Sequence, residues 1–207
     1  MSEPHILLTG FQPFGGDTVN PSGDIAKAVD GRRFGPFAVR GIVLPVEHVA
    51  ARRAVAAALD EAGLGAVLHL GLAGGRARIA LEQIGVNAMD YPLPDAAGRV
   101  VTGEPCASGG PGAHFATLPT RAILAALTAE GVPAYLSYTA GTYLCNFVLY
   151  STLHALAPRP TPPPAGFIHL PFLPAMVAGH GLDEPSMEMG LMLRAVEIAL
   201  TVVAASV

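Results

Sequence analysis

The chain has 207 residues, of which 51% are hydrophobic and 14% are charged. This composition excludes an intrinsically disordered protein. The formal net charge of -4 and the absence of lysine- and arginine-rich blocks argue against a nucleic-acid partner. At this length one substantial core is expected, and we predict a single domain over residues 1–207.

Three features predict a cytoplasmic protein without a membrane segment. Met1–Pro4 lacks the basic region of a signal peptide. The most apolar stretch, Met187–Val207, is interrupted by charged residues, and its apolar residues recur at helical spacing, so we expect an amphipathic helix there. Two cysteines are too few for a disulfide framework, which favours a reducing compartment.

Short β-rich runs alternate with helical patterns along the chain, as in α/β proteins built on a parallel sheet. The predicted strands are 5–9, 37–46, 66–70, 134–138 and 167–170, and an extended segment is predicted at 79–88. The predicted helices are 22–29, with Ser22 as the N-cap, 49–62, 120–130, 142–157 and one within 187–207. We therefore expect a three-layer α/β/α sandwich around a mostly parallel, twisted sheet.

Glycine- and proline-rich segments connect these elements. Turns at 10–16 and 71–75 follow two predicted strands, and a long loop occupies 89–112. A loop of that length is more often functional than idle. The proline-rich connector 159–164 is stiff but too short to separate two domains.

Cys145 is a candidate nucleophile because it follows a strand and opens a helix. With Thr142 as the N-cap, Cys145 is the third helical residue and lies in the first turn. There the helix dipole and the free backbone N–H groups favour a thiolate over the ordinary thiol pKa of about 8.5, and the same groups can stabilise an oxyanion. A small buried cysteine is the commoner situation, so position alone leaves both interpretations open.

A cysteine nucleophile needs a base, and the chain has seven histidines. His5 and His69 lie inside predicted strands and fit core positions. His154 lies nine residues after Cys145 on the same helix and cannot reach it. His169 ends a predicted strand, and the carboxyl ends of parallel strands are where ligands bind. We therefore expect His169 at the same edge of the sheet as Cys145.

The third group would be an acid that orients the histidine. Glu82 stands in a mostly apolar segment, where a carboxylate is costly unless it has a partner. An exposed glutamate on an edge strand is the alternative, and Asp90 and Asp95 compete for the role. No cluster of residues has the spacing of a zinc site, and the 71–75 turn lacks the lysine of a P-loop, so no metal or cofactor is predicted. Cys106 has no candidate base near it in the sequence, so we do not assign it a catalytic role.

Four motifs follow one another along almost the whole chain. They are Leu8–Gly16 with Asn20–Ser22, Leu81–Asn87 with Pro94–Asp95, Thr139–Asn146 and Gly166–Phe172. Together they resemble the pyroglutamyl peptidase I family, also called pyrrolidone-carboxylate peptidases. Four ordered motifs are far more specific than any one of them.

The resemblance implies a cofactor-free cysteine exopeptidase that removes an N-terminal pyroglutamyl residue from peptides. Carried over by motif, Cys145 is the nucleophile, His169 is the general base and then acid, and Glu82 is the orienting acid. The resemblance also implies a homotetramer. Pyroglutamate is a flat neutral lactam, which requires an apolar pocket with a few hydrogen bonds. The substrate-binding positions implied are Phe11, Phe14, Asn20 and Leu72, with the two phenylalanines sandwiching the lactam ring.

Three positions depart from the family pattern. Leu72 replaces a usual glutamine, Pro92 a usual arginine and Ala96 a usual asparagine. If that arginine stabilises the oxyanion, its loss costs about 2.7–4 kcal/mol unless a residue such as Arg99 compensates. The alternatives are therefore a cysteine amidase for another small amide, and a weakly active ligand-binding homologue.

Overall fold

A seven-stranded sheet with helices on both faces forms the centre of the protein. The computed structural model describes residues 2–181 and 183–207. The strands are β1 (His5–Phe11), β2 (Arg33–Phe34), β3 (Phe37–Leu44), β4 (Leu64–Leu72), β5 (Ile79–Glu82), β6 (Ile84–Val86), β7 (Ala113–Phe115), β8 (Ala134–Ser137) and β9 (Ala165–Leu170). The helices are α1 (Pro21–Ala28), α2 (His48–Leu59), α3 (Thr120–Ala129), α4 (Leu144–Leu156), α5 (Pro174–His180) and α6 (Met189–Ala204).

The large sheet has the strand order β2-β3-β1-β4-β9-β5-β8. Neighbours are parallel at β3-β1, β1-β4, β4-β9 and β5-β8, and antiparallel at β2-β3 and β9-β5. The expected mostly parallel α/β/α sandwich is therefore confirmed. The antiparallel direction of β5 relative to β9 was not predicted, and this direction determines which residue of β5 lies beside the end of β9.

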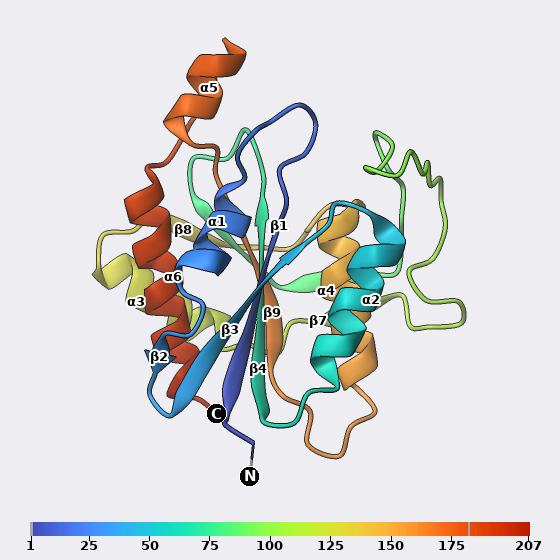
Figure 1. Ribbon diagram of the computed structural model, residues 1–207, viewed down its shortest axis with the longest axis vertical. Helices are drawn as coiled ribbons and strands as arrows, with labels where there is room; N and C mark the ends of the chain where they lie inside the picture. The colour runs from blue at the N-terminus through green and yellow to red at the C-terminus, as the bar shows by residue number, and fades with distance from the viewer. Residues whose placement is uncertain (1, 182) are drawn as a thin grey trace.

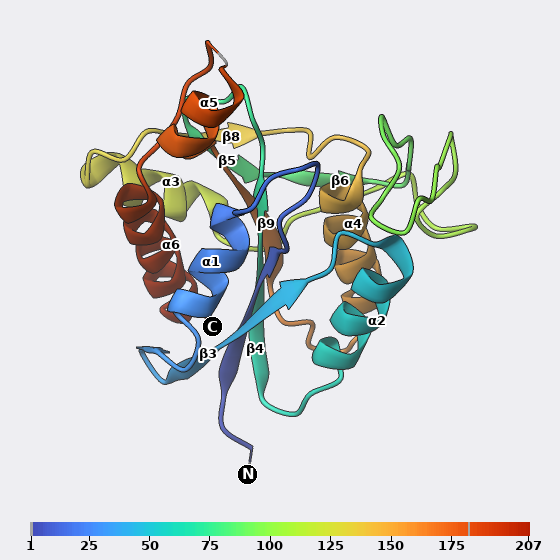
Figure 2. The same cartoon turned by 45° about the horizontal axis from the view of Figure 1, so that its top comes forward.

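Two hydrophobic clusters define the outer layers. Helices α1, α3 and α6 cover one face of the sheet, whereas α2 and α4 cover the other (Figures 1 and 2). The small β6-β7 sheet packs against α4. The apolar face of α6 is buried against the protein's own core. Among the described residues, no helix is both long and apolar enough to cross a membrane.

The close packing of α1 on the sheet depends on Gly10 in β1. A Cβ there would lie 2.0 Å from the backbone oxygen of Ser22, so only glycine fits. Ser22 does not cap α1 as predicted. The N-cap is Asn20, whose side chain accepts from the Ser22 N–H, and Pro21 is the first helical residue. Asn20 outcompetes Ser22 because Ser22 uses its hydroxyl to accept from the Phe11 N–H (3.0 Å).

Several short elements were not predicted. The 79–88 segment divides into β5 and β6, and the sequence patterns did not indicate β2, β7 or α5. The long loop after β6 is held by an isolated bridge between Met89 and Glu104. The longer strands and helices otherwise lie where their hydrophobic patterns place them, with ends that differ by a few residues.

Candidate active site

A pocket of about 490 Å³ opens where β1, β3, β4 and β9 end. It lies at the carboxyl ends of the parallel strands, as expected for an open α/β sheet. Its walls are mostly apolar, and Cys145 is one of the lining residues. The others are Phe11, Phe14, Gly15, Asp17, Val19, Asn20, Val46, Leu72, Gly74, Leu93, Tyr143, Leu144 and Phe172.

Cys145 lies in the first turn of α4, at its second position. The predicted N-cap, Thr142, is wrong: its hydroxyl donates to the Asp90 carbonyl (2.7 Å), and Tyr143 is the N-cap without a side-chain hydrogen bond to the helix. In the described part of the chain, no other residue accepts a hydrogen bond from the backbone N–H of Cys145 or Asn146. The start of α4 therefore presents unpaired donors beside the thiol.

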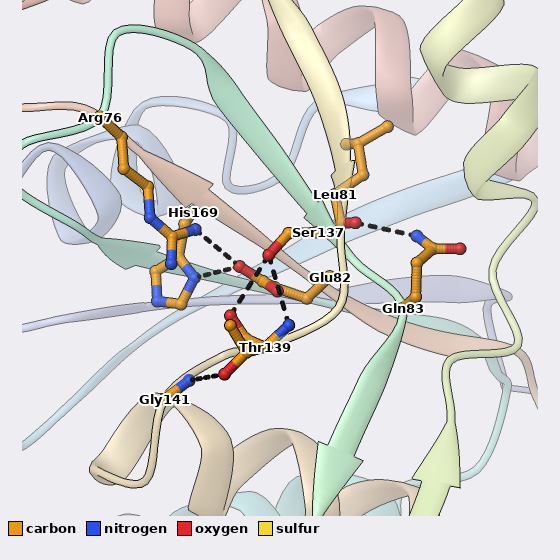
Figure 3. A network of polar contacts seen from close by, with 8 residues as sticks. All are labelled: Arg76, Leu81, Glu82, Gln83, Ser137, Thr139, Gly141 and His169. Atoms are coloured by element: carbon orange, nitrogen blue, oxygen red, sulfur yellow. Dashed lines mark hydrogen bonds and ion pairs between the residues drawn. The ribbon is translucent and has the colours of Figure 1, made fainter.

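His169 and Glu82 form a buried hydrogen-bonded pair. His169 Nδ1 lies 2.8 Å from Glu82 Oε1, and the Glu82 side chain is fully buried. Because a carboxylate only accepts, Nδ1 carries the proton and Nε2 is left with its lone pair. Arg76, which lies next to His169, donates to the same carboxylate oxygen (2.9 Å; Figure 3). The alternative of an exposed Glu82 on an edge strand is therefore wrong.

The register of the sheet brings this pair toward Cys145. Gly71 of β4 pairs with His169 of β9, and a Cβ added at Gly71 would lie 2.9 Å from Cys145 Sγ. Paired residues of neighbouring strands share a face of the sheet, so His169 lies on the face where Cys145 sits. The structure has no hydrogen bond between these two side chains within the described residues, a common situation before a substrate binds.

The protonation states differ from those expected. Desolvation and the negative charge of Glu82 raise the pKa of Cys145 to about 12, against the opposing effect of Arg76. Desolvation and the charge of Glu82 thus oppose the thiolate that the position at the start of α4 favours. Burial lowers the pKa of His169, although Glu82 opposes this effect. Near neutral pH the site thus holds a thiol and an uncharged imidazole.

Glu82 stays ionised in spite of its burial. Desolvation acts to raise its pKa, but hydrogen bonds and the charge of His169, with contributions from Ser137 and Arg76, lower it overall. Oε2 itself has no hydrogen-bond partner in the described part of the chain. The nearby Ser137 hydroxyl donates instead to the Thr139 carbonyl (3.2 Å; Figure 3).

The four predicted substrate-binding residues all line the pocket. Phe11 is buried and Phe14 stacks at a tilt against Tyr143, with ring centroids 6.0 Å apart. Leu72 ends β4 and contributes an apolar wall. Asn20 uses its amide within the protein, donating to the Gln12 carbonyl (3.0 Å) and accepting from Ser22, so it holds the 12–20 loop in place. Their contacts with a substrate stay predictions.

Two other residues were considered for roles in the site: Arg99 as a replacement for the family's arginine, and Asp95 as an alternative to Glu82. Arg99 pairs with Glu104 and lines a second cavity, so it is not a substitute for the arginine that Pro92 replaces. Asp95 accepts from three backbone N–H groups, of His48, Ala97 and Arg99, and thereby shapes the long loop. Within the described residues, the polar partners of Asp95 and Arg99 do not include His169 or Glu82.

His69 and Cys106 lie outside the active-site pocket and have structural roles. His69 is a core residue as expected, held between the hydroxyls of Thr9 (2.7 Å) and Thr152 (2.9 Å). Cys106 is buried, and desolvation raises its pKa to about 11. It lines the second cavity, of about 680 Å³, which contains none of Glu82, Cys145 and His169. The described residues hold no cluster of three or more potential metal ligands.

Arg76 was missed by the sequence analysis. It follows the glycine-rich turn after β4, two residues before Arg78, and an arginine there has no signal that separates it from a solvated surface residue. Its partner could be recognised only once β5 was known to lie beside β9 in the reversed direction. Tyr143, which closes one wall of the pocket, was missed as well.

A partly exposed thiol next to a buried histidine–carboxylate pair on this fold defines a cysteine peptidase. The family model described as pyroglutamyl peptidase matches residues 4–206. This chain therefore belongs to the pyroglutamyl peptidase family.

Individual relatives agree with this assignment. The chain is 42% identical to the pyrrolidone-carboxylate peptidase of Pyrococcus furiosus over 200 residues, covering 95% of this chain and 96% of the relative. It is 46% identical to that of Chromobacterium violaceum over 175 residues, covering 84% and 81%. A crystal structure of a P. furiosus mutant matches with a TM-score of 0.94 at 40% identity, covering 98% and 99%. The Thermococcus litoralis enzyme matches with a TM-score of 0.92 at 41% identity, covering 96% and 92%.

Proposed function

We propose that this protein removes an N-terminal pyroglutamyl residue from peptides, with Cys145 as nucleophile, His169 as general base and acid, and Glu82 as the acid that orients His169. The observation that carries the proposal is the position of Cys145 on the pocket wall, over the strand residue that pairs with His169. Family membership supports the same reaction.

The first step starts from a neutral thiol and a neutral imidazole. As Cys145 Sγ attacks the pyroglutamyl carbonyl carbon, its proton passes to Nε2 of His169. Glu82 then faces an imidazolium, whose positive charge it stabilises through the 2.8 Å contact with Nδ1. This coupling removes the need for a preformed thiolate, which agrees with the raised pKa of Cys145.

The negative charge that develops on the carbonyl oxygen needs donors. The unpaired N–H groups at the start of α4 are positioned for this role, and the helix dipole adds to their effect. Collapse of the tetrahedral intermediate breaks the C–N bond, and His169 gives its proton to the leaving amine. A water molecule, deprotonated by His169, then attacks the thioester carbonyl, and the released sulfur recovers its proton.

The pocket matches the chemistry of the lactam. The rings of Phe11 and Phe14 and the side chain of Leu72 offer apolar contacts to a flat neutral ring. An ordinary charged N-terminus would be poorly solvated there, because burying an unpaired charge is costly. This difference favours pyroglutamyl peptides over peptides with a free N-terminus.

A panel of chromogenic amides tests the proposal. We expect the pyroglutamyl amide to be hydrolysed far faster than the prolyl and glutamyl amides, and Cys145→Ala to abolish the activity. Cys106→Ala is the matched control, because Cys106 lies outside the pocket and should be dispensable. Equal turnover of the three amides would contradict the specificity, and full activity of Cys145→Ala would contradict the mechanism.

A second candidate is a cysteine amidase for another small amide. The observation that favours it is the apolar Leu72 on the pocket wall, where the family pattern has a hydrogen-bonding glutamine. The same panel decides between the two, because this candidate requires a non-lactam amide as the best substrate. A protein that binds pyroglutamyl peptides but does not hydrolyse any of the amides would instead be a ligand-binding homologue.

We further propose a cytoplasmic homo-oligomer, a tetramer by resemblance to the family. Both cysteines are free thiols, which fits a reducing compartment. Cell fractionation tests the location. Sedimentation tests the assembly, and a monomer would reject the tetramer without affecting the catalytic proposal.

A further inference from the structure

Arg76 shares one carboxylate oxygen with His169. Its Nη1 lies 2.9 Å from Glu82 Oε1, and His169 Nδ1 lies 2.8 Å from the same atom. The two donors come from different elements, the turn after β4 and the strand β9, and they converge on the carboxylate in Figure 3. The Arg76 side chain is 25% exposed, whereas Glu82 is fully buried. Arg76 thus links a buried pair to the surface of the molecule.

We infer that Arg76 is a positioning residue of the catalytic centre, which fixes the Glu82 carboxylate and thereby the imidazole of His169. This inference rests on the proposed function and adds a fourth residue to it. Arg76 acts through Glu82 and is not assigned a contact with the substrate.

The geometric part of the inference follows from the hydrogen bonds of Glu82. Its second oxygen, Oε2, has no partner among the described residues, so Oε1 carries both donors. Without Arg76, only His169 would restrain the carboxylate, and rotation about the last side-chain bond would become easier. Arg76 makes this contact through one nitrogen, Nη1, of a rigid planar group, and a flexible ammonium group or a neutral amide does not present a charged donor in the same position.

The electrostatic part concerns the three groups that face one another here. Glu82 comes from β5, His169 from β9 and Cys145 from α4, and Arg76 is the cation among them. Its charge acts to lower the pKa of each of these groups, in the case of Glu82 through the hydrogen bond. Arg76 therefore adds to the effects that favour an ionised Glu82 and an unprotonated His169, which is the state the base requires.

The sign of the effect can be derived for a variant. Removing the positive charge of Arg76 raises the pKa of His169, so the imidazole is protonated, and useless as a base, up to a higher pH. The acid limb of the kcat/KM profile should therefore move to higher pH in Arg76→Gln. Arg76→Lys keeps the charge and should leave the acid limb near its wild-type position, although its activity falls because the guanidinium donor to Glu82 Oε1 is lost.

The experiment compares pH profiles for the pyroglutamyl amide in wild type, Arg76→Gln, Arg76→Lys and Arg78→Gln. Arg78 is the matched control, since it lies two residues away and stacks on the Tyr135 ring at 4.6 Å. We expect kcat/KM of Arg76→Gln to fall about 10- to 100-fold, the range found when a partner that orients a metal-bound histidine is removed. The loss should lie mainly in kcat, and Arg78→Gln should match wild type.

Two results would overturn the inference while leaving the proposed function intact. One is an Arg76→Gln enzyme with wild-type kcat and an unmoved acid limb. The other, which decides the matter if Arg76→Gln does not fold, is an Arg76→Lys enzyme whose acid limb moves although the charge is retained. A wild-type protein without activity on the pyroglutamyl amide would instead reject the proposed function itself.

Discussion

Gly71→Ala is a sensitive test of the geometry around Cys145. The added Cβ would lie 2.9 Å from Cys145 Sγ and 2.7 Å from the Phe167 ring, whereas ordinary contacts begin at 3.4 Å. The shortfall is thus 0.5 Å for the sulfur and 0.7 Å for the ring. The thiol or the ring must move, and either movement changes the position of the Cys145 thiol relative to the His169 imidazole.

The expected loss of activity follows from this displacement. A misplacement of about 1 Å at a reacting centre costs about 100-fold in rate, so we expect kcat/KM to fall about 10- to 100-fold. Overpacking in a core also costs about 1–3 kcal/mol of stability. The variant should therefore be folded, somewhat less stable and slow, as measured by thermal unfolding and by hydrolysis of the pyroglutamyl amide.

Gly65→Ala separates the two effects. Gly65 lies on the same strand, and a Cβ there would meet the Phe37 ring at 2.3 Å, far from the pocket. This control should lose a similar amount of stability but keep its kcat. If Gly71→Ala lost stability and kept wild-type kcat/KM, the placement of Cys145 over β4 would be refuted.

Three further predictions concern the orienting acid, the pocket and the core. Glu82→Gln should lower kcat by about 10⁴-fold, as the corresponding carboxylate-to-amide change does in a serine protease triad, whereas Glu104→Gln, in an exposed ion pair with Arg99, should not. Leu72→Gln should improve kcat/KM for the pyroglutamyl amide by about 2- to 10-fold, the value of one hydrogen bond of about 0.5–1.5 kcal/mol, and an equal change for the prolyl amide would contradict it. Burial lowers the pKa of His69 to about 3 from 6.5, so unfolding takes up a proton and stability falls as the pH drops from 6.5 toward 3, by about 1.4 kcal/mol per unit. Urea unfolding at pH 7 and pH 4.5 should show a smaller pH dependence in His69→Gln than in wild type.

The sequence patterns predicted those parts of the site that depend on local order. Cys145 follows a strand and opens a helix, and His169 ends a strand, so both were expected at one edge of the sheet. Glu82 was distinguished from Asp90 and Asp95 by family resemblance alone. Its burial follows from the antiparallel pairing of β5 with β9, and hydrophobic patterns do not reveal strand direction.

The wrong N-cap at Thr142 and the raised pKa of Cys145 both arise from long-range contacts. Thr142 suits an N-cap by residue type, but its hydroxyl is taken by the Asp90 carbonyl, a residue 52 positions away. The helix dipole favours a thiolate at Cys145, but the walls of the pocket desolvate it and the nearby Glu82 opposes a second negative charge. In both cases a contact between distant segments outweighs a local preference.

The architecture also explains how this chain can depart from its family at Leu72 and Pro92 without losing its nucleophile. Glu82 and His169 lie on adjacent strands, and Cys145 lies in the first turn of a buried helix, so the core of the protein fixes all three. The 12–20 loop supplies more of the pocket wall than any other segment, and the long loop after β6 and the end of β4 add Leu93 and Leu72. Pro92 lies in the long loop and Leu72 is the last residue of β4, so both positions can change the substrate contacts while the reacting groups keep their positions.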